Sequence, residues 1–395
     1  MQLDQRHQRA LVNAVVAAAT TAILGLIVVS LLPSGEGATG ARPSPTAAGP
    51  SPLGSCEPSW DRVPSPTPED GGALLADVAV VAPDLAWAVG GSGDPVEPRT
   101  TLAIVWNGAE WDLVITPNAG SLGNRFDAVD ALSPDAAWAV GRASSGTGAI
   151  PIAAQWDGGS WTLLPSSPDV PEGAFLGVEA ITTDEVWAVG YAGDPELGTE
   201  RAVALRWNGF EWTSSPLRDA IGGGRSALVA IAGTSGSDLW AVGYHRARPM
   251  ILHFDGSTWT PSSSDVRGSV LGVVALAPDD AWIVGERIQR FDGTAWTEVA
   301  APRRPGVTLR AVAAVSPTDV WAVGSRPNPD GVLKPLVLRW DGSAWSRVPG
   351  RGVVGAVALT GVGALPDGTV LGVGYRDGPE GRTTFALRGT TCVAA

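Results

Sequence analysis

The sequence predicts an all-β protein: a seven-bladed β-propeller of four-stranded antiparallel blades, preceded by one N-terminal transmembrane helix. Three observations predict this architecture. A WAVG tetrad or a close variant recurs seven times, a turn of the W-[DN]-G-x-x-W type follows six of the copies, and an uncharged apolar run stands near the N-terminus. Repeats of about 40 to 50 residues with four strands each are typical of propellers, because one such sheet cannot bury both of its apolar faces alone.

One repeat, residues 309–348, shows the pattern of the others. Its first run, LRAVAAVS, is rich in β-branched and small apolar residues and stops at Pro317, as a strand before a turn does. VWAVG and PLVLRW are two further strands, and the turn Asp341-Gly342 leads into a fourth strand, AWSRV, because this dipeptide tolerates the positive φ of a tight hairpin. The tetrad and its variants WIVG and LGVG begin at Trp87, Trp138, Trp187, Trp240, Trp282, Trp321 and Leu371.

The seventh repeat ends near Cys392, one strand short. The missing strand is found at the other end of the chain, where CEPSWDRVPSP (residues 56–66) matches the fourth-strand sequence DGSAWSRVPG (residues 341–350) and aligns Trp60 with Trp345. We expect this N-terminal strand to complete the seventh blade, because closing the ring removes open sheet edges. The propeller is therefore predicted to span residues 56–392.

The N-terminal region predicts a plasma-membrane protein with a single span. Residues 11–32 carry no charge, and at about 1.5 Å per residue they are long enough to cross a bilayer as a signal-anchor helix. Basic residues among residues 1–10 favour a cytoplasmic tail and an extracytoplasmic propeller. A cleaved signal peptide, which would give a secreted protein, has an apolar core of only about 7 to 15 residues. Residues 33–55, rich in Pro, Gly, Ala and Ser, predict a disordered linker.

The chain has two cysteines, Cys56 and Cys392. They lie on either side of the predicted seam of the ring, and both are expected outside the cell, where disulfides persist. The interpretation we favour is a disulfide that clasps the seventh blade. Two independent buried thiols are the alternative.

Composition limits the possible partners. The net charge of -13, with Lys334 as the one lysine, argues against nucleic acid and against anionic membrane surfaces, so membrane contact is expected through the N-terminal helix only. The 17 tryptophans recur at matched positions, which favours core packing over sugar stacking. No His or Cys cluster has metal-ligand spacing and no nucleophile or phosphate-binding motif is present, so we expect no cofactor, no metal and a monomer, and lean against an enzyme.

The combination of D-x-W-A-V-G with W-[DN]-G-x-x-W resembles the WAVG-type repeats of uncharacterised secreted or anchored bacterial β-propeller proteins. It is more distantly similar to kelch, Asp-box (sialidase-like) and photosystem assembly-factor propellers. The resemblance covers about residues 56–392 and implies the fold rather than an activity. The Asp-box pattern S-x-D-x-G-x-x-W is not matched, and neither the arginine triad of sialidases nor the copper ligands of galactose oxidase can be assigned.

Two classes of function follow. The first is a non-enzymatic binding or scaffold module that presents its loops to a protein or a glycan. The second is a carbohydrate-active hydrolase or lyase, similar to sialidases, with catalytic residues in the loops of one face. The regular repeats and the lack of a His, Cys or Tyr cluster favour binding.

The binding surface is predicted on the face that carries the second-to-third and fourth-to-first strand connections, where the loops are long and dissimilar. Blades 4 and 5 depart from this pattern, because GYHRARP (residues 243–249) and GERIQR (residues 285–290) are short and basic. We expect a notch in the rim there, in which guanidinium groups hold an acidic glycan or protein segment. Solvated arginines without a ligand are the alternative. The predicted notch residues are His245, Arg246, Arg248, Arg287 and Arg290.

Overall fold

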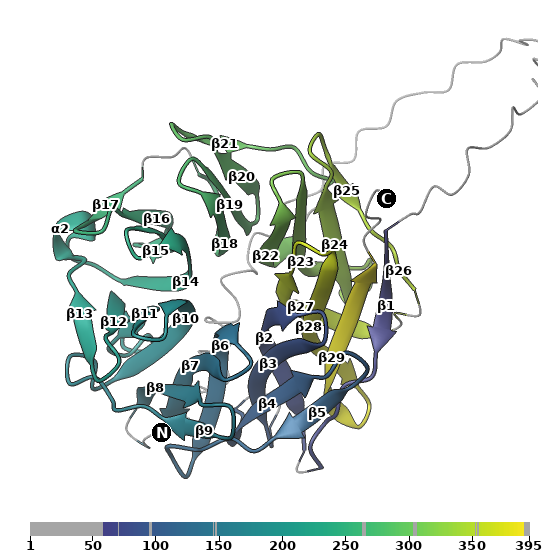
Figure 1. Ribbon diagram of the computed structural model, residues 1–395, viewed down its shortest axis with the longest axis horizontal. Coiled ribbons are helices and arrows are strands. Elements are labelled where there is room, and N and C mark those ends of the chain that lie inside the picture. Colours follow the sequence, from purple (N-terminus) through teal and green to yellow (C-terminus); the bar gives the residue numbers. More distant parts are fainter. Residues whose placement is uncertain are drawn as a thin grey trace, which may run out of the picture. The chain divides into compact units, whose positions relative to one another are not determined.

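The computed structural model describes residues 58–390 except positions 70, 95–96, 145, 147, 263–265, 303–305, 352 and 354. Seven sheets surround an axis, and the first strand of the four antiparallel strands of each blade lies nearest to that axis (Figure 1). Six sheets have four strands and one has five. The predicted all-β, seven-bladed propeller of four-stranded blades is therefore confirmed.

Blades 1 to 6 each use four consecutive strands, numbered from the axis outward. Blades 1, 2 and 3 are β2 (Ala73–Ala82), β3 (Leu85–Ser92), β4 (Thr100–Trp106), β5 (Trp111–Val114); β6 (Gly123–Ser133), β7 (Ala136–Ser144), β8 (Ala149–Trp156), β9 (Trp161–Leu163); and β10 (Gly173–Thr182), β11 (Glu185–Ala192), β12 (Arg201–Trp207), β13 (Trp212–Ser215). Blades 4, 5 and 6 are β14 (Ser226–Ser235), β15 (Asp238–His245), β16 (Arg248–Phe254), β17 (Trp259–Pro261); β18 (Val270–Ala277), β19 (Asp280–Gly285), β20 (Ile288–Phe291), β21 (Trp296–Glu298); and β22 (Thr308–Ser316), β23 (Asp319–Pro327), β24 (Leu333–Trp340), β25 (Trp345–Arg347).

Blade 7 joins the two ends of the described chain. It contains β27 (Ala356–Ala364), β28 (Thr369–Gly378), β29 (Gly381–Thr390) and, as its outer antiparallel strand, β1 (Ser59–Val63), with Trp60 opposite Gly389. The predicted closure by the N-terminal strand is thus confirmed. Cys56, Cys392 and residues 1–55 lie outside the described residues, so the disulfide, the membrane helix and the linker stay predictions. Among the residues that are described, no helix has the length and apolar character needed to span a membrane.

The second strand of each blade, which carries the WAVG tetrad or its variant, is covered on both faces. In β11, every residue from Val186 to Tyr191 is buried. The glycine of the tetrad allows close packing: a Cβ on Gly190 would lie 1.9 Å from the carbonyl oxygen of Ala174, where the paired strand β10 has a bulge. The tetrad glycine therefore fixes how closely the first two strands of a blade approach.

The core lies between neighbouring blades. The ring of Trp187 in blade 3 packs against Phe254 and Trp259 of blade 4, with 4.9 and 5.9 Å between ring centroids. The six WAVG and WIVG tryptophans are at most 2% exposed, so they are core residues, as the sequence predicts.

Two short elements were not predicted. β26 (Gly350–Arg351) adds a parallel fifth strand to blade 7 beside β1, and α2 (Arg218–Ile221) forms one helical turn between β13 and β14. Both elements are too short, at two and four residues, for a hydrophobic periodicity to show in the sequence. Buried Leu217, just before α2, attaches that turn to the core between blades 3 and 4.

Candidate functional site

The two faces of the propeller differ in regularity. The first-to-second and third-to-fourth strand connections form the turn face, and the remaining connections form the variable face. In the turn between β16 and β17, Asp255 accepts hydrogen bonds from the Ser257 hydroxyl and from the backbone N–H groups of Ser257 and Thr258, which lower the pKa of Asp255 to about 2. Similar turns are made by Asn107, Asp157, Asn208, Asp292 and Asp341.

The hairpin between β15 and β16 is the most unusual connection of the variable face. Its two loop residues, Arg246 and Ala247, have φ values of 52° and 61°, and among the described residues no other non-glycine residue has a positive φ. Such two-residue loops normally contain Asn and Gly, since side chains with a Cβ are strained in this region. Strain of this kind is concentrated at functional sites.

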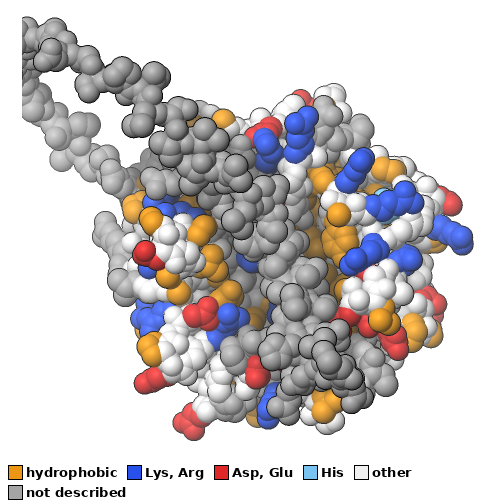
Figure 2. Space-filling model, turned by 180° about the vertical axis from the view of Figure 1, so that it is seen from behind, with side chains coloured by type: hydrophobic (Ala, Val, Ile, Leu, Met, Phe, Trp, Pro, Cys, Tyr) orange, Lys and Arg blue, Asp and Glu red, His pale blue; other side chains and the backbone are white. Residues whose placement is uncertain are grey.

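Three of the predicted notch residues come together on this hairpin. Arg246 Nη2 donates a hydrogen bond to the carbonyl oxygen of Gly223 at 2.7 Å, and His245 Nε2 lies 3.2 Å from the same oxygen. Arg248 is exposed, and no hydrogen bond or ion pair joins its side chain to another described residue. Figure 2 shows that Lys and Arg side chains gather on the side of one face where blade 4 lies.

The structure places Arg287 and Arg290 differently. Arg287 stands in the hairpin between β19 and β20, but its guanidinium forms an ion pair with Glu298. Arg290 belongs to β20 rather than to a loop, and its Nε and Nη2 atoms donate to both oxygens of Asp280 at 2.8 and 2.9 Å. Asp280 begins β19 at the turn face, so the side chain of Arg290 points away from the notch hairpin.

The Asp280–Arg290 contact is one of a set of acid–base pairs. Such a pair occurs in each of blades 3 to 6. The acidic residue is the first residue of the second strand of the blade, and the basic residue lies on the third strand, opposite the tryptophan of the tetrad in the strand register. The guanidinium of Arg290 also lies over the ring of Trp282, 5.2 Å from its centroid, so the pairs cover the core tryptophans. The others are Glu185–Arg206 at 3.0 Å, Asp238–His253 at 2.7 Å and Asp319–Arg339 at 2.7 Å.

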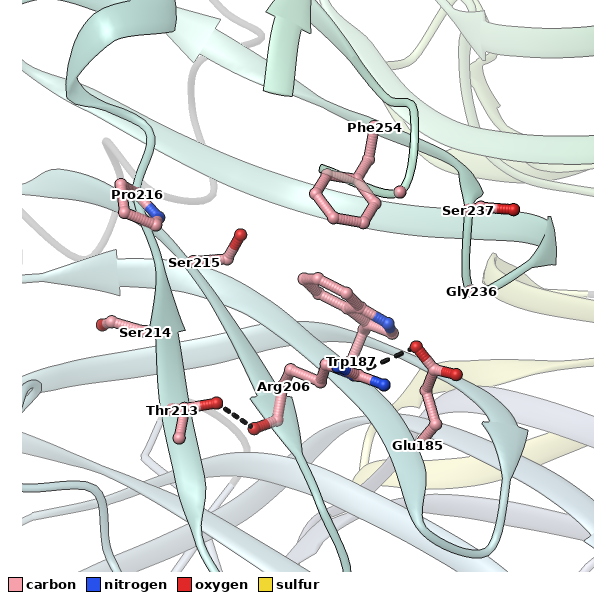
Figure 3. Close-up of a pocket in the computed structure, with 11 residues that line it drawn as sticks. Glu185, Trp187, Arg206, Thr213, Ser214, Ser215, Pro216, Gly236, Ser237 and Phe254 are labelled. Atoms are coloured by element: carbon pink, nitrogen blue, oxygen red, sulfur yellow. Dashed lines mark hydrogen bonds and ion pairs between the residues drawn. The ribbon is translucent and has the colours of Figure 1, made fainter. Parts of the chain in front are cut away.

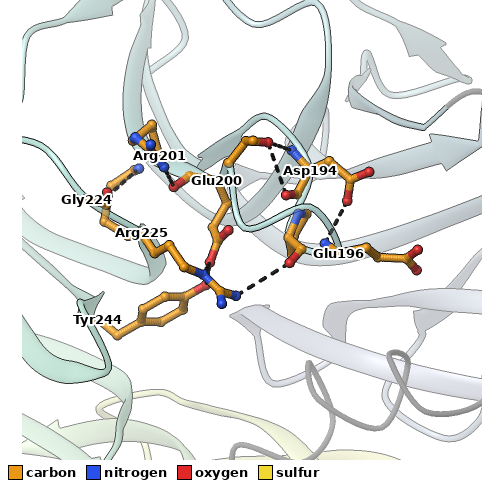
Figure 4. A network of polar contacts seen from close by, with 11 residues as sticks. Asp194, Glu196, Glu200, Arg201, Gly224, Arg225 and Tyr244 are labelled. Atoms are coloured by element: carbon orange, nitrogen blue, oxygen red, sulfur yellow. Dashed lines mark hydrogen bonds and ion pairs between the residues drawn. The ribbon is translucent and has the colours of Figure 1, made fainter. Parts of the chain in front are cut away.

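A buried glutamate lies between blades 3 and 4, in contact with the strand β15 that precedes Arg246 (Figure 4). The side chain of Glu200, just before β12, is fully buried, and its Oε1 atom accepts hydrogen bonds from Arg225 Nε at 2.7 Å and from the Tyr244 hydroxyl at 3.3 Å. Its Oε2 atom has no hydrogen-bond partner among the described residues. Because a buried carboxylate without a counter-charge is costly, Arg225 fixes the loop before β14 onto blade 3.

The charges of this cluster are mutually dependent. Burial and the neighbouring Glu200 carboxylate raise the pKa of Tyr244 to about 12, so its hydroxyl stays protonated and donates. The hydrogen bond to Glu200 raises the pKa of Arg225. Arg225 was not predicted from the sequence; its signal was an arginine after three glycines just before β14, near the predicted notch residues.

A second charged cluster lies on blade 2. Asp127, whose side chain is 5% exposed, accepts from Arg125 Nη2 at 2.5 Å and from Arg142 Nη1 at 3.3 Å. Burial lowers the pKa of Arg125, while the Asp127 carboxylate raises that of Arg142. The single carboxylate is therefore compensated by two guanidinium groups.

Carboxylates also join the inner strands. Asp77 accepts a hydrogen bond from the Val129 N–H group at 3.2 Å, Asp130 from that of Ala180 at 2.7 Å, and Glu179 from that of Gly233 at 3.1 Å. Burial raises the pKa of Asp77 and Asp130 to about 6 and that of Glu179 well above its ordinary value. Within the described part of the chain, no group of three or more His, Cys, Asp or Glu side chains is arranged to hold a metal ion.

A pocket of about 530 Å³ opens at the turn-face end of the boundary between blades 3 and 4 (Figure 3). Residues of β13 form one wall, the turn between β14 and β15 forms the opposite wall, and Trp187 and Phe254 lie between them. No sequence signal had pointed to this pocket. Its lining residues are Glu185, Trp187, Arg206, Thr213, Ser214, Ser215, Pro216, Gly236, Ser237, Phe254 and Gly256.

Comparisons with known proteins identify the fold but not a family. No family model and no curated protein matches the chain. YCF48 bound to a D1 peptide is similar at 17% identity with a TM-score of 0.56, over 84% of this chain and 97% of that one. A catalytically inactive virginiamycin B lyase from Staphylococcus aureus with quinupristin is similar at 13% identity with a TM-score of 0.58, over 85% and 100%.

The WD40 propeller domain of Doa1 is also similar, at 10% identity with a TM-score of 0.55, over 83% of this chain and 96% of that one. These neighbours include a peptide binder and an enzyme, so at such low identity the likeness extends to the propeller fold alone. The resemblance to WAVG-type repeat proteins stays a prediction from the motifs.

Proposed function

We propose that this chain is a membrane-anchored, extracytoplasmic β-propeller that binds an acidic segment of a partner protein on its variable face, without catalysis. The observation that carries the proposal is the β15–β16 hairpin, which holds Arg246 in a strained conformation next to Arg248. Arginine in a positive-φ loop costs stability that an asparagine or glycine would not. A binding role explains why a basic residue occupies that position.

The electrostatics of the chain support an acidic ligand. Against a net charge of -13, the exposed Arg246 and Arg248 form a local positive surface beside His245, while the charge of the neighbouring Arg225 is balanced by Glu200. Guanidinium groups bind carboxylates through paired, charge-assisted hydrogen bonds. Acidic groups elsewhere on the surface repel the same ligand, so binding is directed to the notch.

A protein ligand is favoured over a glycan because YCF48, which shares the fold, is recorded with a bound peptide. The enzymatic alternative has less support. The buried side chains of Asp127 and Glu200 are both compensated by arginines rather than free to act as acid or base.

The membrane anchor in this proposal rests on the sequence. Arg6 and Arg9 precede the uncharged residues 11–32, and the linker of residues 33–55 would separate the propeller from the bilayer. Protease added to intact cells should then remove the propeller and leave a short membrane-bound fragment. A full-length protein that resists the protease, or one released into the medium, would contradict the anchor.

Binding is tested with the full chain in detergent, using a fluorescent poly-glutamate peptide as the probe and anisotropy as the readout. Replacing Arg246→Glu and Arg248→Glu together should weaken binding at least about a hundredfold and reduce its dependence on salt, because two charge-assisted contacts are lost. Arg62→Glu with Arg99→Glu is the matched control, since both residues are exposed on other blades and the change in net charge is the same.

The outcomes separate the proposal from general electrostatics. Equal losses in the two double variants would show that only net charge matters and that the notch is not the site. An unmodified chain that does not bind the peptide at low salt would remove the case for an acidic partner.

A further inference from the structure

The pocket between blades 3 and 4 exists because several positions that are bulky in other blades are small there. Ser214 and Ser215 of β13 occupy the positions of Leu163 and Leu164 in blade 2. Gly236 occupies a turn position that holds proline in four other blades, at Pro83, Pro134, Pro278 and Pro317. Since Ser262 of blade 4 stands at the position equivalent to Ser215, it is the combination of Ser214 with Gly236 that distinguishes this boundary.

Gly236 leaves room for the charged wall of the pocket. A Cβ at this position would lie 2.4 and 2.5 Å from the two carboxylate oxygens of Glu185. The glycine therefore lets the Glu185 carboxylate lie against the turn, where it pairs with Arg206 Nε at 3.0 Å. The side chain of Arg206 is 49% exposed and lines the pocket.

The lining combines hydroxyl groups with an aromatic floor (Figure 3). Thr213, Ser214 and Ser237 are exposed and supply hydroxyls. The rings of Trp187 and Phe254 lie between the two walls and line the space. The indole Nε1 of Trp187 has no acceptor within the described residues, and although the same holds for other tetrad tryptophans, here a pocket adjoins it.

We propose that this pocket is a second binding site, specific for one sugar unit of a neutral glycan. Adjacent sugar hydroxyls can donate to Glu185 and accept from Arg206, and the serine and threonine hydroxyls can do both. Because Glu185 and Arg206 neutralise each other, an ionised ligand would have to compete with that ion pair, whereas a neutral polyol leaves it intact. The volume of 530 Å³ lies within the range of about 300 to 1,000 Å³ of small-molecule sites.

This site is independent of the proposed acidic-peptide notch. The pocket opens at the turn face, whereas the β15–β16 hairpin belongs to the variable face. A propeller with both sites can hold a protein on one side and a glycan on the other. Substitutions at Arg246 and Arg248 should leave the pocket unchanged.

Saturation-transfer difference NMR tests this proposal. The full chain in detergent is mixed with methyl glycosides of glucose, galactose, mannose and N-acetylglucosamine, and the saturation transferred from the protein to each glycoside is measured. At least one glycoside should receive saturation from the protein. The double variant Ser214→Leu with Ser215→Leu, which copies blade 2, should abolish that signal by filling the pocket. Arg206→Gln should weaken binding about tenfold through the loss of a charge-assisted hydrogen bond and should keep the fold, because Arg206 is half exposed.

Ser262→Leu is the matched control for the filled variant. Ser262 of blade 4 accepts a hydrogen bond from Trp296 Nε1 at 3.1 Å, just as Ser215 accepts one from Trp259 Nε1 at 3.0 Å, but Ser262 does not line the pocket. Glycoside signals that persist in the filled variant, or that Ser262→Leu removes equally, would overturn the proposal. Saturation of none of the four glycosides would overturn it too, as would stronger binding of glucuronate or glucosamine than of the neutral sugars.

Discussion

The indole ring of Trp60 meets the ring of Trp321 edge-on, with 5.4 Å between their centroids and 71° between their planes. Trp60 belongs to β1 in blade 7 and Trp321 to the tetrad of blade 6. The same contact joins Trp345 of blade 6 to Trp282 of blade 5, again at 5.4 Å. The N-terminal strand therefore contributes the same core side chain that every other outer strand contributes.

Trp60→Ala should lower the free energy of unfolding by about 3 to 5 kcal/mol, because it removes a fully buried aromatic side chain. Urea denaturation followed by circular dichroism measures the loss. Arg62→Ala on the same strand is the control and should cost less than about 1 kcal/mol, since Arg62 is exposed. Equal midpoints for Trp60→Ala and the unmodified chain would mean that β1 does not hold the ring closed.

The stability of the propeller should increase as the pH falls from 7.5 to 5. The pKa of Asp77 and Asp130 is about 6 in the folded chain and 3.8 as the ordinary value, so the folded state binds more protons in this interval. Their contribution to the unfolding free energy is fully present below pH 3.8 and is lost as the pH rises through 6. We expect a difference of about 1 to 3 kcal/mol, limited by the solvent contact that both side chains keep.

Asparagine variants check this prediction. Asp77→Asn with Asp130→Asn keeps an oxygen that can accept the hydrogen bonds of the Val129 and Ala180 N–H groups but removes the titrating proton. The urea midpoint of this double variant should depend less on pH between 5 and 7.5 than that of the unmodified chain, and Glu179, whose pKa burial also raises, accounts for part of the dependence that remains. A pH dependence that is the same with and without these carboxyl groups would assign it to other residues.

Arg225→Ala should destabilise the chain by about 2 to 3 kcal/mol, because it leaves the buried Glu200 carboxylate without its counter-charge. The value is set below that of a fully buried pair, since the side chain of Arg225 is 55% exposed and water can enter in its place. Adding Glu200→Gln to Arg225→Ala should recover part of the loss. If the double variant is less stable than Arg225→Ala alone, the two residues do not compensate each other.

Gly190→Ala should be among the most damaging alanine substitutions, at about 2 to 4 kcal/mol, because the added Cβ would lie 1.9 Å from the Ala174 oxygen and force the first two strands of blade 3 apart. Gly223→Ala is the matched comparison, since nothing lies within 4 Å of a Cβ there and its φ is not positive. Thermal unfolding should separate the two variants by several degrees. Similar melting temperatures would show that the bulged strand of blade 3 yields easily.

The sequence predicted the elements that depend on repetition. Trp187 and Gly190 occur at fixed positions in a strand buried on both faces, and the need to fill or clear the same space in each blade makes such positions recognisable. The role of Trp60 was predictable for the same reason, since it completes a repeat. Arg246 and Arg248 could be predicted to lie in a short connection of the variable face because few residues separate the two strands there.

The contacts and the pocket that the sequence did not predict depend on strand register and on how neighbouring blades pack. Arg290 looked like a loop residue because β20 is only four residues long, yet its register opposite Trp282 directs it to Asp280. Arg225 meets Glu200 only after two blades pack together. The pocket results from small side chains in two different blades, and a missing side chain leaves no motif to recognise.

Blade 7 combines the first described strand with the last, so the order of synthesis affects how the ring forms. The register of β1 on β29, from Ser59 opposite Thr390 to Val63 opposite Ala386, cannot form until nearly the whole propeller has left the ribosome. Until then β1 has an unpaired edge that the β29 strand of another molecule can occupy, and strands exchanged in this way give swapped dimers. Slow release of the C-terminal residues should therefore yield chains joined to one another rather than closed rings, whereas truncation before Gly381 removes β29 and with it the strand that would be exchanged.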